Sequence, residues 1–556
     1  MMDRKKIRWN GWGWVEAHDD VSGRPELWAW LARELGMPSL LATPARKLEE
    51  ITLPESRLRD EERGKFIAML GAEQVRADDY ERAFHALGRS YHDVLRLRAG
   101  DLSTAPDIVL YARNQADVLA VLSYASERGI AVVPFGGGSS VVGGVTAGHG
   151  KFGAVVTLDL SLMDRVLDVD RVSMTAEIEA GIYGPALEKA LQAQGLTLGH
   201  YPQSFEFSTL GGWIAHAGAG QQSNRYGRSA DWIVSATVAT PRGMLATDNF
   251  PASAAGPRLK DLFIGSEGAF GVVTQARVRI HEAPAKKIYT GFLFKDFESG
   301  AQAIRAAVHE DVPSAMLRVS DADETRFYRA FGDLGKEHGL KDALTERYLA
   351  AKGLDRAPAA MIAGFEGDTV HVAESQRAFG KIAKRFGALS VGQGMGKRWF
   401  EGRFHGPYLR DPMMDRGVGV DTLETSTMWA NIPKLHRAVT TALHTAMAET
   451  APRPGARGIV MGHISHSYPD GASLYFTYIF PRQLEGEIAQ WRKIKAAASD
   501  AIAANGGTIS HHHGVGEDHL PWIGQEKGEL GIAVLRAIKH TLDPNGVLNP
   551  GKLIPD

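Results

Sequence analysis

Three glycine-rich segments, each joined to a short β-rich run, constrain this chain more than any other feature of its sequence. They are PFGGGSSVVGGV (134–145), GHYPQSFEFSTLGGWIAHAGAGQQSNRYG (199–227) and GSEGAFGVVT (265–274). Because glycine has no side chain, successive backbone N–H groups in such a loop can turn toward one anion. Each segment alone is a weak signal, but three of them in one block indicate a long cofactor that several elements contact.

The first loop is the most informative of the three. It follows the β-rich run AVVP (131–134), and Ser139 and Ser140 add hydroxyl donors to its glycines. A strand that leads into such a loop is a common way to hold a pyrophosphate, although GGGSS in isolation is as typical of a flexible turn. The loop matches neither the G-x-x-x-x-G-K-[ST] pattern of P-loop nucleotidases nor the G-x-G-x-x-G register of nicotinamide-binding folds.

Length and composition limit the classes of protein to which this chain can belong. Its 556 residues suggest about two or three large domains. A net charge of -2 argues against a general nucleic-acid binder, because no basic excess exists to neutralise phosphates. The absence of cysteine excludes disulfides, thiolate metal sites, iron–sulfur clusters, a cysteine nucleophile and a cysteine-linked flavin.

Neither a secretory signal nor a membrane span is expected. The N-terminal sequence carries basic side chains but no apolar h-region, and no run approaches the roughly 18 apolar residues of a spanning helix. We therefore expect a soluble, cytoplasmic protein.

Hydrophobic spacing after Pro106 predicts an α+β block. In order, its expected elements are a strand at 107–112, a helix at 115–128, a strand at 131–134, three strands between 155 and 181, a helix at 185–195 capped by Gly195, and two strands between 234 and 280.

A second block with alternating strands and helices begins near 285. Its expected elements are strands at 291–294, 314–320, 359–367 and 474–480, and helices at about 297–309, at about 370–386 and after Pro481. The first hundred residues are charged and mostly helical in pattern. We therefore expect three regions, at 1–100, 101–282 and 283–556, the last of them an α+β domain built on an antiparallel sheet.

The three loops and several further motifs resemble one flavoprotein family. The loops at 134–140 and 265–274 and the segment at 206–213 resemble the FAD-binding domain of the vanillyl-alcohol-oxidase, or PCMH, type. Within that superfamily the chain is most similar to the alkyldihydroxyacetonephosphate synthases of ether-lipid synthesis. The similarity runs nearly end to end through RWNGWG (8–13), PDIVLYA (106–112), FEGD (365–368), LETS (423–426), DGASLYF (470–476) and SHHHGVG (510–516).

This resemblance implies a two-subdomain FAD-binding domain followed by an α+β substrate or cap domain, with FAD held by three sets of residues. The set for the pyrophosphate is Pro134, Phe135, Gly136, Gly137, Gly138, Ser139 and Ser140. The set that lines the flavin is Gln203, Ser204, Phe205, Glu206, Phe207, Ser208 and Thr209. The remaining set is His216, Ala217, Gly218, Ala219, Gly265, Ser266, Glu267, Gly268, Ala269, Phe270 and Gly271.

The resemblance also implies an activity. The family exchanges the acyl group of acyl-dihydroxyacetone phosphate for a fatty alcohol through an adduct at flavin N5, so the partner is a phosphorylated, lipid-like small molecule. The matching residues are Tyr475 (proton donor or acceptor), Arg410 (substrate binding), Arg318 (activity) and the histidine run His511, His512 and His513. We expect no metal and a homodimer, and peripheral membrane contact stays open.

The chemistry of these residue types agrees with such roles. A guanidinium fork suits a phosphate dianion, and a histidine that titrates near neutral pH can move protons with little tuning. A tyrosine would need a nearby cation, such as Arg410 or Arg318, to act as a base. The structural alternatives are a surface ion pair for Arg410, a half-buried sheet position for Tyr475, and a solvated loop or a metal site for the histidine run.

The main alternative activity is an FAD-linked dehydrogenase of D-2-hydroxy acids. The segment LDPNGVLNPGKL (542–553) resembles those enzymes, and the chain departs from the synthase pattern at Gln203, Ala217, Gln221–Gln222 and Glu517–His519. The dehydrogenases hold a divalent metal with histidines and a glutamate. Here His463 remains, but Tyr475 and His512 stand where a ligand histidine and the glutamate would be. Loss of that carboxylate favours the synthase interpretation, since a hard cation would be poorly compensated.

Two weaker alternatives complete the set. A zinc hydrolase could use His463, His466 and the histidine run, since the first two have HxxH spacing. It would leave both the tyrosine and the glycine-rich loops without a role. The other alternative is a flavin-binding or scaffold protein without catalysis.

Overall fold

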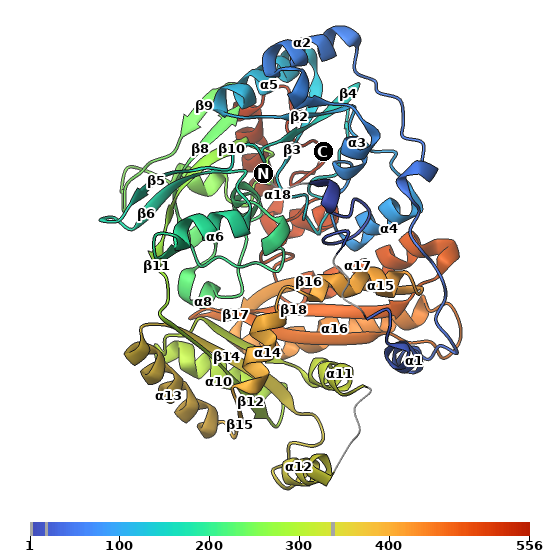
Figure 1. The fold of residues 1–556 in the computed structure, drawn as a ribbon, viewed down its shortest axis with the longest axis vertical. Helices are drawn as coiled ribbons and strands as arrows, with labels where there is room; N and C mark the ends of the chain where they lie inside the picture. The colour runs from blue at the N-terminus through green and yellow to red at the C-terminus, as the bar shows by residue number, and fades with distance from the viewer. Residues whose placement is uncertain (1–3, 17–20, 335–339, 556) are drawn as a thin grey trace.

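The computed structural model describes residues 4–16, 21–334 and 340–555, and it divides into an upper and a lower part in the view of Figure 1. The blue and green segments form the upper part around two sheets. The yellow and orange segments form the lower part around one large sheet. The red C-terminal segment returns to the upper part, so both ends of the chain lie there.

The first sheet of the upper part carries the first glycine-rich loop. Its strand order is β1-β2-β4-β3, in which β2 (Ile108–Tyr111), β4 (Ala154–Asp159) and β3 (Ile130–Phe135) run parallel and β1 (Val75–Arg76) is antiparallel. The crossover helix α5 (Gln115–Arg128) begins at the Asn114 cap, whose side chain accepts from the Asp117 N–H. Because β3 runs directly into Gly136, the loop leaves the carboxyl edge of the parallel strands, where α/β sheets commonly bind ligands.

The second sheet of the upper part is antiparallel and receives the other two glycine-rich segments. Its strand order is β5 (Val166–Asp170), β6 (Thr175–Glu179), β10 (Val272–Arg279), β8 (Ile233–Thr240) and β9 (Gly243–Ala246). The second segment contains the short helices α7 (Leu210–Ala215) and α8 (Ser223–Tyr226), and the third segment leads into β10. The helix α6 (Gly184–Gln192) follows β6, and β7 (Leu196–Thr197) pairs with β11 (His281–Glu282).

The lower part is a seven-stranded antiparallel sheet. Its strand order is β15 (Leu389–Gly392), β12 (Lys286–Phe294), β14 (Ala359–Gly367), β13 (Met316–Ser320), β17 (Ile459–Ser467), β18 (Gly471–Pro481) and β16 (Val418–Met428). Four helices cover one face, namely α10 (Phe297–His309), α13 (Thr369–Arg385), α16 (Ile432–Glu449) and α17 (Glu487–Ala504).

Side chains alternate between the two faces of this sheet, as the pleat of a strand requires. Apolar residues such as Leu474 and Phe476 point into the helix-covered core, while Tyr475 between them points to the other face. His463 and Glu424 share that face, because each is paired with Tyr475 in the strand register. The period of the strand thus collects polar side chains on the face turned toward the upper part.

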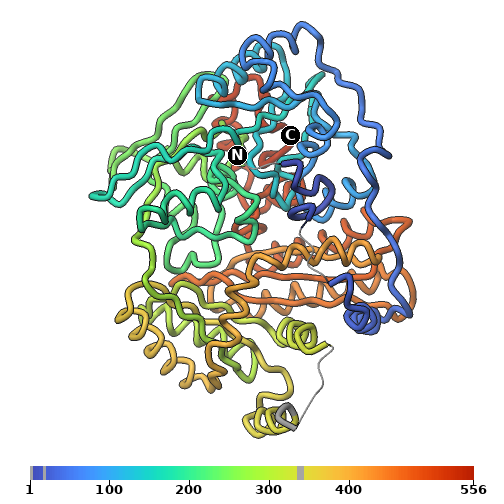
Figure 2. Tube along the Cα trace, viewed as in Figure 1, coloured from blue at the N-terminus to red at the C-terminus, as the bar shows by residue number. Residues whose placement is uncertain are grey.

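The N-terminal region and the C-terminal segment both pack against the sheets described above. The helices α1 (Pro25–Glu34), α2 (Asp60–Leu70), α3 (Asp79–Phe84) and α4 (Tyr91–Ala99) lie in the N-terminal region, which runs along one side of the molecule (Figure 2). The long C-terminal helix α18 (Leu520–Leu542) packs into the core of the upper part. After it, the Asn549 N–H donates to the Val132 carbonyl at 2.8 Å, so the C-terminal segment also contacts β3.

The predicted α+β class is confirmed, and most predicted elements lie where they were expected. The helix predicted at 185–195 ends earlier, at Gln192, and Ala193 rather than Gly195 is its C-cap residue. Elements without a prediction include β9, β15, β16, α16, β17, α18 and the helices α11 (Ala322–Asp333), α12 (Leu340–Ala351), α14 (Gly394–Gly402) and α15 (Arg410–Met414). Among the described helices, none is both long and apolar enough to cross a bilayer.

Candidate functional site

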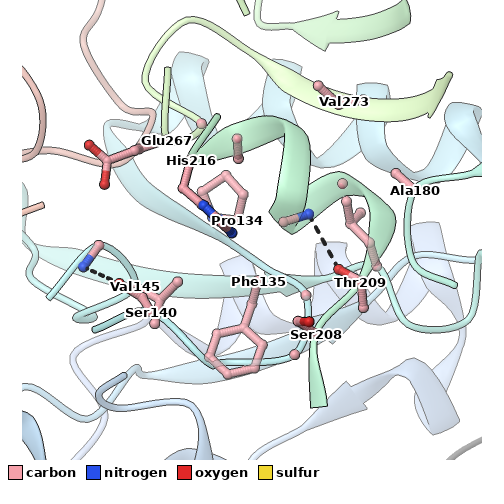
Figure 3. A pocket seen from close by; sticks show the side chains of 18 of the residues that line it. Pro134, Phe135, Ser140, Val145, Ala180, Ser208, Thr209, His216, Glu267 and Val273 are labelled. Atoms are coloured by element: carbon pink, nitrogen blue, oxygen red, sulfur yellow. Dashed lines mark hydrogen bonds between the residues drawn. The ribbon is translucent and has the colours of Figure 1, made fainter. Parts of the chain in front are cut away.

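All three glycine-rich segments line one cavity in the upper part, which we call the loop cavity (Figure 3). Its lining includes Pro134, Phe135, Gly136, Gly137, Gly138, Ser139, Ser140, Ser208, Thr209, His216, Ser266, Glu267, Gly268 and Gly271. These residues come from two sheets and from positions up to 137 residues apart in the sequence (134 to 271). These fourteen of the cofactor residues that the resemblance implies therefore lie around one cavity.

Only glycine fits where the first loop meets the second segment. A Cβ on Gly137 would lie 1.8 Å from the Phe207 carbonyl oxygen, and one on Gly136 would lie 2.3 Å from Thr209 Oγ1. The loop backbone is therefore exposed to the cavity without intervening side chains, so a bulky polyphosphate can approach its N–H groups closely. These walls suit the pyrophosphate of a dinucleotide.

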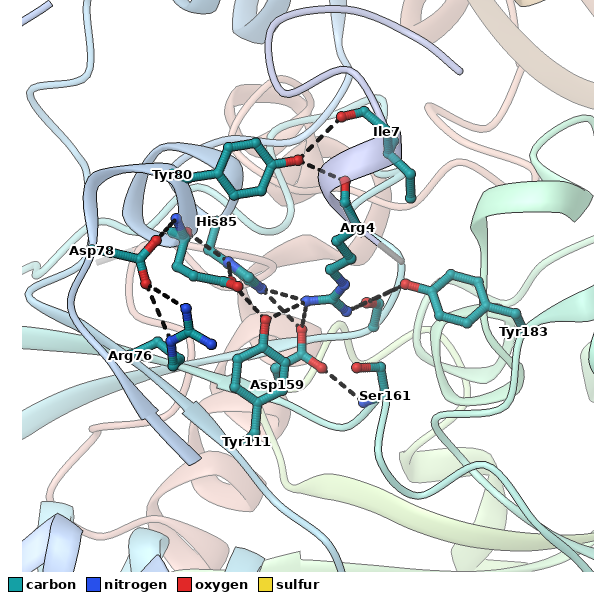
Figure 4. Close-up of polar contacts among 12 residues, drawn as sticks. Arg4, Ile7, Arg76, Asp78, Tyr80, His85, Tyr111, Asp159, Ser161 and Tyr183 are labelled. Carbon is teal, nitrogen blue, oxygen red and sulfur yellow. Dashed lines mark hydrogen bonds and ion pairs between the residues drawn. The ribbon is translucent and has the colours of Figure 1, made fainter. Parts of the chain in front are cut away.

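The N-terminal segment contacts this loop through the side chain of Arg4, whose polar partners Figure 4 shows. Arg4 is buried, forms an ion pair with Asp159 at the end of β4 and donates from Nη2 to the Gly136 carbonyl at 3.0 Å. His85 lies 2.9 Å from the same Asp159 carboxylate. Arg4 lowers the pKa of Asp159 to about 2, against the opposing effect of burial, so this carboxylate stays charged. This contact joins residues 155 positions apart, so no local pattern in the sequence predicts it.

Several of the expected cofactor residues lie outside the loop cavity. Phe207 packs edge-on against Trp12 and Trp14, and Phe205, Ala269 and Phe270 belong to the buried core. Gln203, Ser204 and Ala219 line a second cavity instead. The remaining four, which are Glu206, Ala217, Gly218 and Gly265, line neither cavity.

The second cavity lies between the loop cavity and the polar face of the seven-stranded sheet, and we call it the sheet cavity. It shares Ser139, Ser140, His216 and His513 with the loop cavity. Five of the residues predicted for catalysis or substrate binding line it, namely Tyr475, His512, His513, Arg318 and Arg410. His511 does not line it, because its imidazole turns to Tyr468, whose hydroxyl lies 2.5 Å from His511 Nε2.

Tyr475 stands among imidazole rings on the wall of the sheet cavity. Its ring centre lies 5.0 Å from that of His463 and 5.6 Å from that of His513. Burial raises the pKa of Tyr475 to about 12, and the charge of Arg318 opposes this only weakly. Arg318 therefore does not supply the lowered pKa that a tyrosine base would need, and the protonated phenol is suited to donate.

The histidine loop is held by one carboxylate that the sequence did not single out. Glu424 on β16 is buried and accepts from the backbone N–H groups of His511, His512 and His513 at 2.8 to 3.0 Å. The Ser510 hydroxyl donates to it at 3.0 Å. Although burial alone would raise it, the backbone N–H groups and the hydroxyl that donate to Glu424 hold its pKa well below its usual range.

Burial lowers the pKa of all three histidines in the loop. For His511 the value falls to about 3, because desolvation outweighs the attraction of Glu424. The pKa values of His512 and His513 are also lowered by burial, that of His513 strongly. The expectation that they titrate near neutral pH without tuning is therefore corrected. At neutral pH the imidazoles are uncharged, so each has a lone pair with which to accept a proton.

The two expected arginines lie in different surroundings. Arg318 donates from Nη2 to Glu324 at 2.6 Å and lies 3.2 Å from His463 Nδ1. Burial would raise the pKa of Glu324, but His463 and Arg318 lower it to about 2, so this pair is charged. Arg410 donates from Nη1 to the Arg89 carbonyl at 2.7 Å. Arg318 is thus compensated by a carboxylate, whereas Arg410 is bonded to a neutral carbonyl.

Three imidazoles also lie close enough together to be considered as metal ligands. His466, His511 and His512 each offer a nitrogen, and these atoms lie within 4.8 Å of one another. His463, which the zinc-hydrolase alternative requires, turns instead to Glu324, with its Nδ1 3.0 Å from that carboxylate. The set differs from the dehydrogenase pattern, because it contains no carboxylate ligand.

We expect Glu424→Ala to loosen the histidine loop. Removing the carboxylate leaves its four buried donors without their acceptor, so the free energy of unfolding should fall by about 3 to 5 kcal/mol. Turnover should fall by about tenfold or more at unchanged flavin content, because the imidazoles lose their alignment. Urea unfolding and steady-state kinetics measure both effects.

The pH dependence of this effect has a definite sign. The folded-state pKa of Glu424 is depressed, so its stabilisation is present above the ordinary glutamate range and is lost as the pH falls below that range. Glu366→Ala is the matched control, since that buried carboxylate accepts from Tyr226 and Tyr289 outside both cavities. It should lower stability without lowering turnover; an equal loss of turnover in both variants would contradict the role given to Glu424.

Family comparisons agree with the two parts of the structure. The model described as FAD binding domain matches residues 106–248, and the model described as FAD linked oxidases, C-terminal domain, matches residues 283–553. The first match covers the parallel sheet and two of the three glycine-rich segments. FAD is therefore the cofactor, and the glycine-walled loop cavity fits its pyrophosphate.

Full-length relatives identify the family. The chain is 34% identical to alkyldihydroxyacetonephosphate synthase of Dictyostelium discoideum, over 99% of this chain and 94% of the relative. A solved structure of an alkyldihydroxyacetonephosphate synthase superposes with a TM-score of 0.83 at 31% identity and covers 99% of this chain and 100% of its own. p-Cresol methylhydroxylase shares the fold alone, with a TM-score of 0.64 at 15% identity over 92% of this chain and 98% of its own. With this identity over nearly its whole length, the chain belongs to the alkyldihydroxyacetonephosphate synthase family of FAD-binding proteins.

Proposed function

We propose that this protein exchanges the acyl group of acyl-dihydroxyacetone phosphate for a long-chain alcohol, without net oxidation or reduction. The observation that carries this proposal is the composition of the sheet cavity. It joins a protonated phenol, neutral imidazoles and an arginine that forms no ion pair with a carboxylate of the described residues to the cavity that suits FAD. This is the activity that the names of the full-length relatives indicate.

Each residue of the sheet cavity has a separate task in this proposal. Arg410 binds the substrate phosphate, which calls for a guanidinium. The carbon that carries the acyl group lies next to a ketone, so a proton on it is acidic enough for His513 to accept through its free imidazole nitrogen. His513 is the proton acceptor of choice because it lines both cavities. When bound, FAD supplies the group on which acyl chain and alcohol are exchanged.

The phenol of Tyr475 completes the proton transfers. With a pKa raised to about 12, it keeps its proton and can donate a hydrogen bond or the proton itself to a substrate oxygen. His513, whose ring centre is 5.6 Å from that of Tyr475, is near enough to share a substrate with it. Arg318, with its partners Glu324 and His463, holds the part of the wall next to Tyr475 and acts as a positioning residue.

An anaerobic titration of the flavin spectrum separates this function from the dehydrogenase alternative. The purified holoprotein is mixed in turn with acyl-dihydroxyacetone phosphate, D-lactate and D-2-hydroxyglutarate. We expect the phosphorylated substrate alone to perturb the oxidised flavin band. Reduction of the flavin by either hydroxy acid would instead support the dehydrogenase.

Metal removal gives a second prediction. Exhaustive dialysis against EDTA should leave turnover unchanged, because the carboxylate beside the histidine loop already accepts three backbone N–H groups and Tyr468 lies against His511. A metal would have to displace these bonds. Loss of activity on chelation, with recovery after zinc or manganese is added, would overturn the roles given to His513 and Tyr475.

Location, assembly and domain boundaries form the last part of this proposal. We propose a cytoplasmic homodimer with regions at 1–100, 101–282 and 283–556 and with peripheral contact to the membrane that supplies its lipid substrates. The seven-stranded sheet begins with Lys286 in sequence order, which supports the second boundary. A sequence without cysteine is compatible with a reducing compartment. Light scattering of the purified protein measures the assembly.

A further inference from the structure

Two arginines lie next to each other on the wall of the sheet cavity. Arg410 is the expected one, and Arg89, which precedes α4, is the second. The Arg89 carbonyl accepts from Arg410 Nη1 at 2.7 Å, and the Arg89 N–H donates to the Ser140 carbonyl at 2.6 Å. Arg89 therefore lies between the end of the first glycine-rich loop and Arg410.

Neither guanidinium forms an ion pair with a carboxylate among the described residues. Arg89 is 5% exposed, and it donates from Nη1 to the Gly88 carbonyl at 2.8 Å and from Nη2 to the Arg8 carbonyl at 3.3 Å. In Arg410, Nε and Nη2 are buried and have no hydrogen-bond partner within the described parts of the chain. Carbonyl dipoles, and the Phe84 ring whose centre lies 5.4 Å from the Arg89 guanidinium carbon, compensate these two charges only in part.

Asp411, the residue after Arg410, is engaged elsewhere. It accepts from the Trp12 N–H at 2.8 Å and lies 3.5 Å from the Arg8 guanidinium. Burial and, after it, the charge of Arg410 lower the pKa of Arg89 to about 10. Two buried like charges facing one cavity are costly until an anion lies between them.

A phosphate monoester has the charge and the oxygens needed to compensate these two positive charges. Its dianion carries about two negative charges and three terminal oxygens, enough to accept from both guanidinium groups at once. We propose that Arg89 and Arg410 together bind the phosphate of the substrate, so that Arg89 is a second substrate-binding residue. This inference rests on the proposed function, because it names the binding site of that substrate's phosphate.

The position of Arg89 also determines which way a bound substrate lies in the sheet cavity. Since its backbone N–H binds the Ser140 carbonyl, the phosphate is anchored beside the loop that lines the FAD cavity. Tyr475 and His513 lie on the wall of the same cavity. A substrate held by its phosphate at one end thus presents its carbonyl carbon toward these proton-transfer groups.

Isothermal titration of the holoprotein with dihydroxyacetone phosphate, and separately with inorganic phosphate, tests the inference. We expect Arg89→Gln to weaken the binding of dihydroxyacetone phosphate by about 10²-fold and Arg89→Lys to weaken it less, because lysine keeps the charge but loses the fork. In kinetics, KM for acyl-dihydroxyacetone phosphate should rise by a similar factor. KM for the alcohol and flavin content should not change.

Arg82→Gln is the matched control. Arg82 is also a buried arginine (7% exposed) that donates to carbonyls, at 2.8 Å to Pro106 and at 2.6 Å to Pro54, but it does not line the sheet cavity. It should leave both KM values unchanged even where it lowers stability. If Arg89→Gln loses its flavin or does not fold, the lysine variant with the same control decides the question.

Failure of the inference about Arg89 can be distinguished from failure of the proposed function. In one outcome, the wild-type protein makes the ether product and Arg410→Gln weakens phosphate binding, but the Arg89 variants bind phosphate as well as wild type. That outcome overturns the role of Arg89 and leaves the proposed function standing. If the wild-type protein binds neither dihydroxyacetone phosphate nor inorganic phosphate, the inference is overturned together with the proposed function.

Discussion

We expect Tyr475→Phe to keep its fold and its bound flavin and to lose turnover by about 10²-fold or more, the usual scale for a general acid–base group. The reason is the protonated phenol, whose pKa burial raises to about 12 and which stands 5.6 Å, centre to centre, from the ring of His513. Phenylalanine retains the ring packing and removes only the donor. The loss should therefore appear in kcat, with KM for both substrates nearly unchanged.

The control for this variant is Tyr226→Phe. Tyr226 is also buried and donates its hydroxyl to Glu366 at 2.9 Å, but it lines neither cavity. It should lose stability by about 1 kcal/mol and keep its kcat. Steady-state kinetics as a function of pH supplies the readout, and a Tyr475→Phe enzyme with wild-type kcat at every pH would remove Tyr475 from the mechanism.

Gly137→Val should give a folded protein without bound flavin. Any Cβ at this position would lie 1.8 Å from the Phe207 carbonyl oxygen and 2.9 Å from the Ser208 Cα, both of them backbone atoms that cannot rotate away. The first loop and the second segment must then move apart, and the loop cavity loses its shape. The ratio of flavin to protein absorbance measures the effect directly.

Gly153→Val tests whether the substitution itself is harmful. Gly153 precedes β4 in the same part of the structure, and a Cβ there meets no atom within 4 Å. This variant should bind flavin like wild type. Full flavin content in Gly137→Val, with a far-UV spectrum like that of wild type, would show that this loop does not hold the pyrophosphate.

Local patterns predicted the framework of the FAD-binding part well. The glycine-rich loops, the β-rich runs beside them and the capped helix at 115–128 are each encoded within a few consecutive residues, so the sequence alone predicts them. The strands of the large sheet were predicted only in part. β16 and β17 carry polar side chains on their cavity face, which obscures the apolar signal of a buried strand.

The residues that the sequence did not reveal are those whose role depends on long-range packing. Glu424 acquires its role by accepting from a loop 87 residues later, and Arg89 by meeting Arg410, 321 residues later. Arg4 similarly reaches Asp159. The depressed pKa values of the histidines have the same origin, because burial is a property of the assembled fold.

The stoichiometry of the products tests the central claim most directly. The holoprotein is incubated without oxygen or any electron acceptor, with acyl-dihydroxyacetone phosphate and a deuterated long-chain alcohol, and the products are quantified by mass spectrometry. We expect one labelled ether product for each fatty acid released, over many turnovers. Fatty acid released without ether product, or an ether product that forms only when an electron acceptor is present, would contradict the proposed exchange.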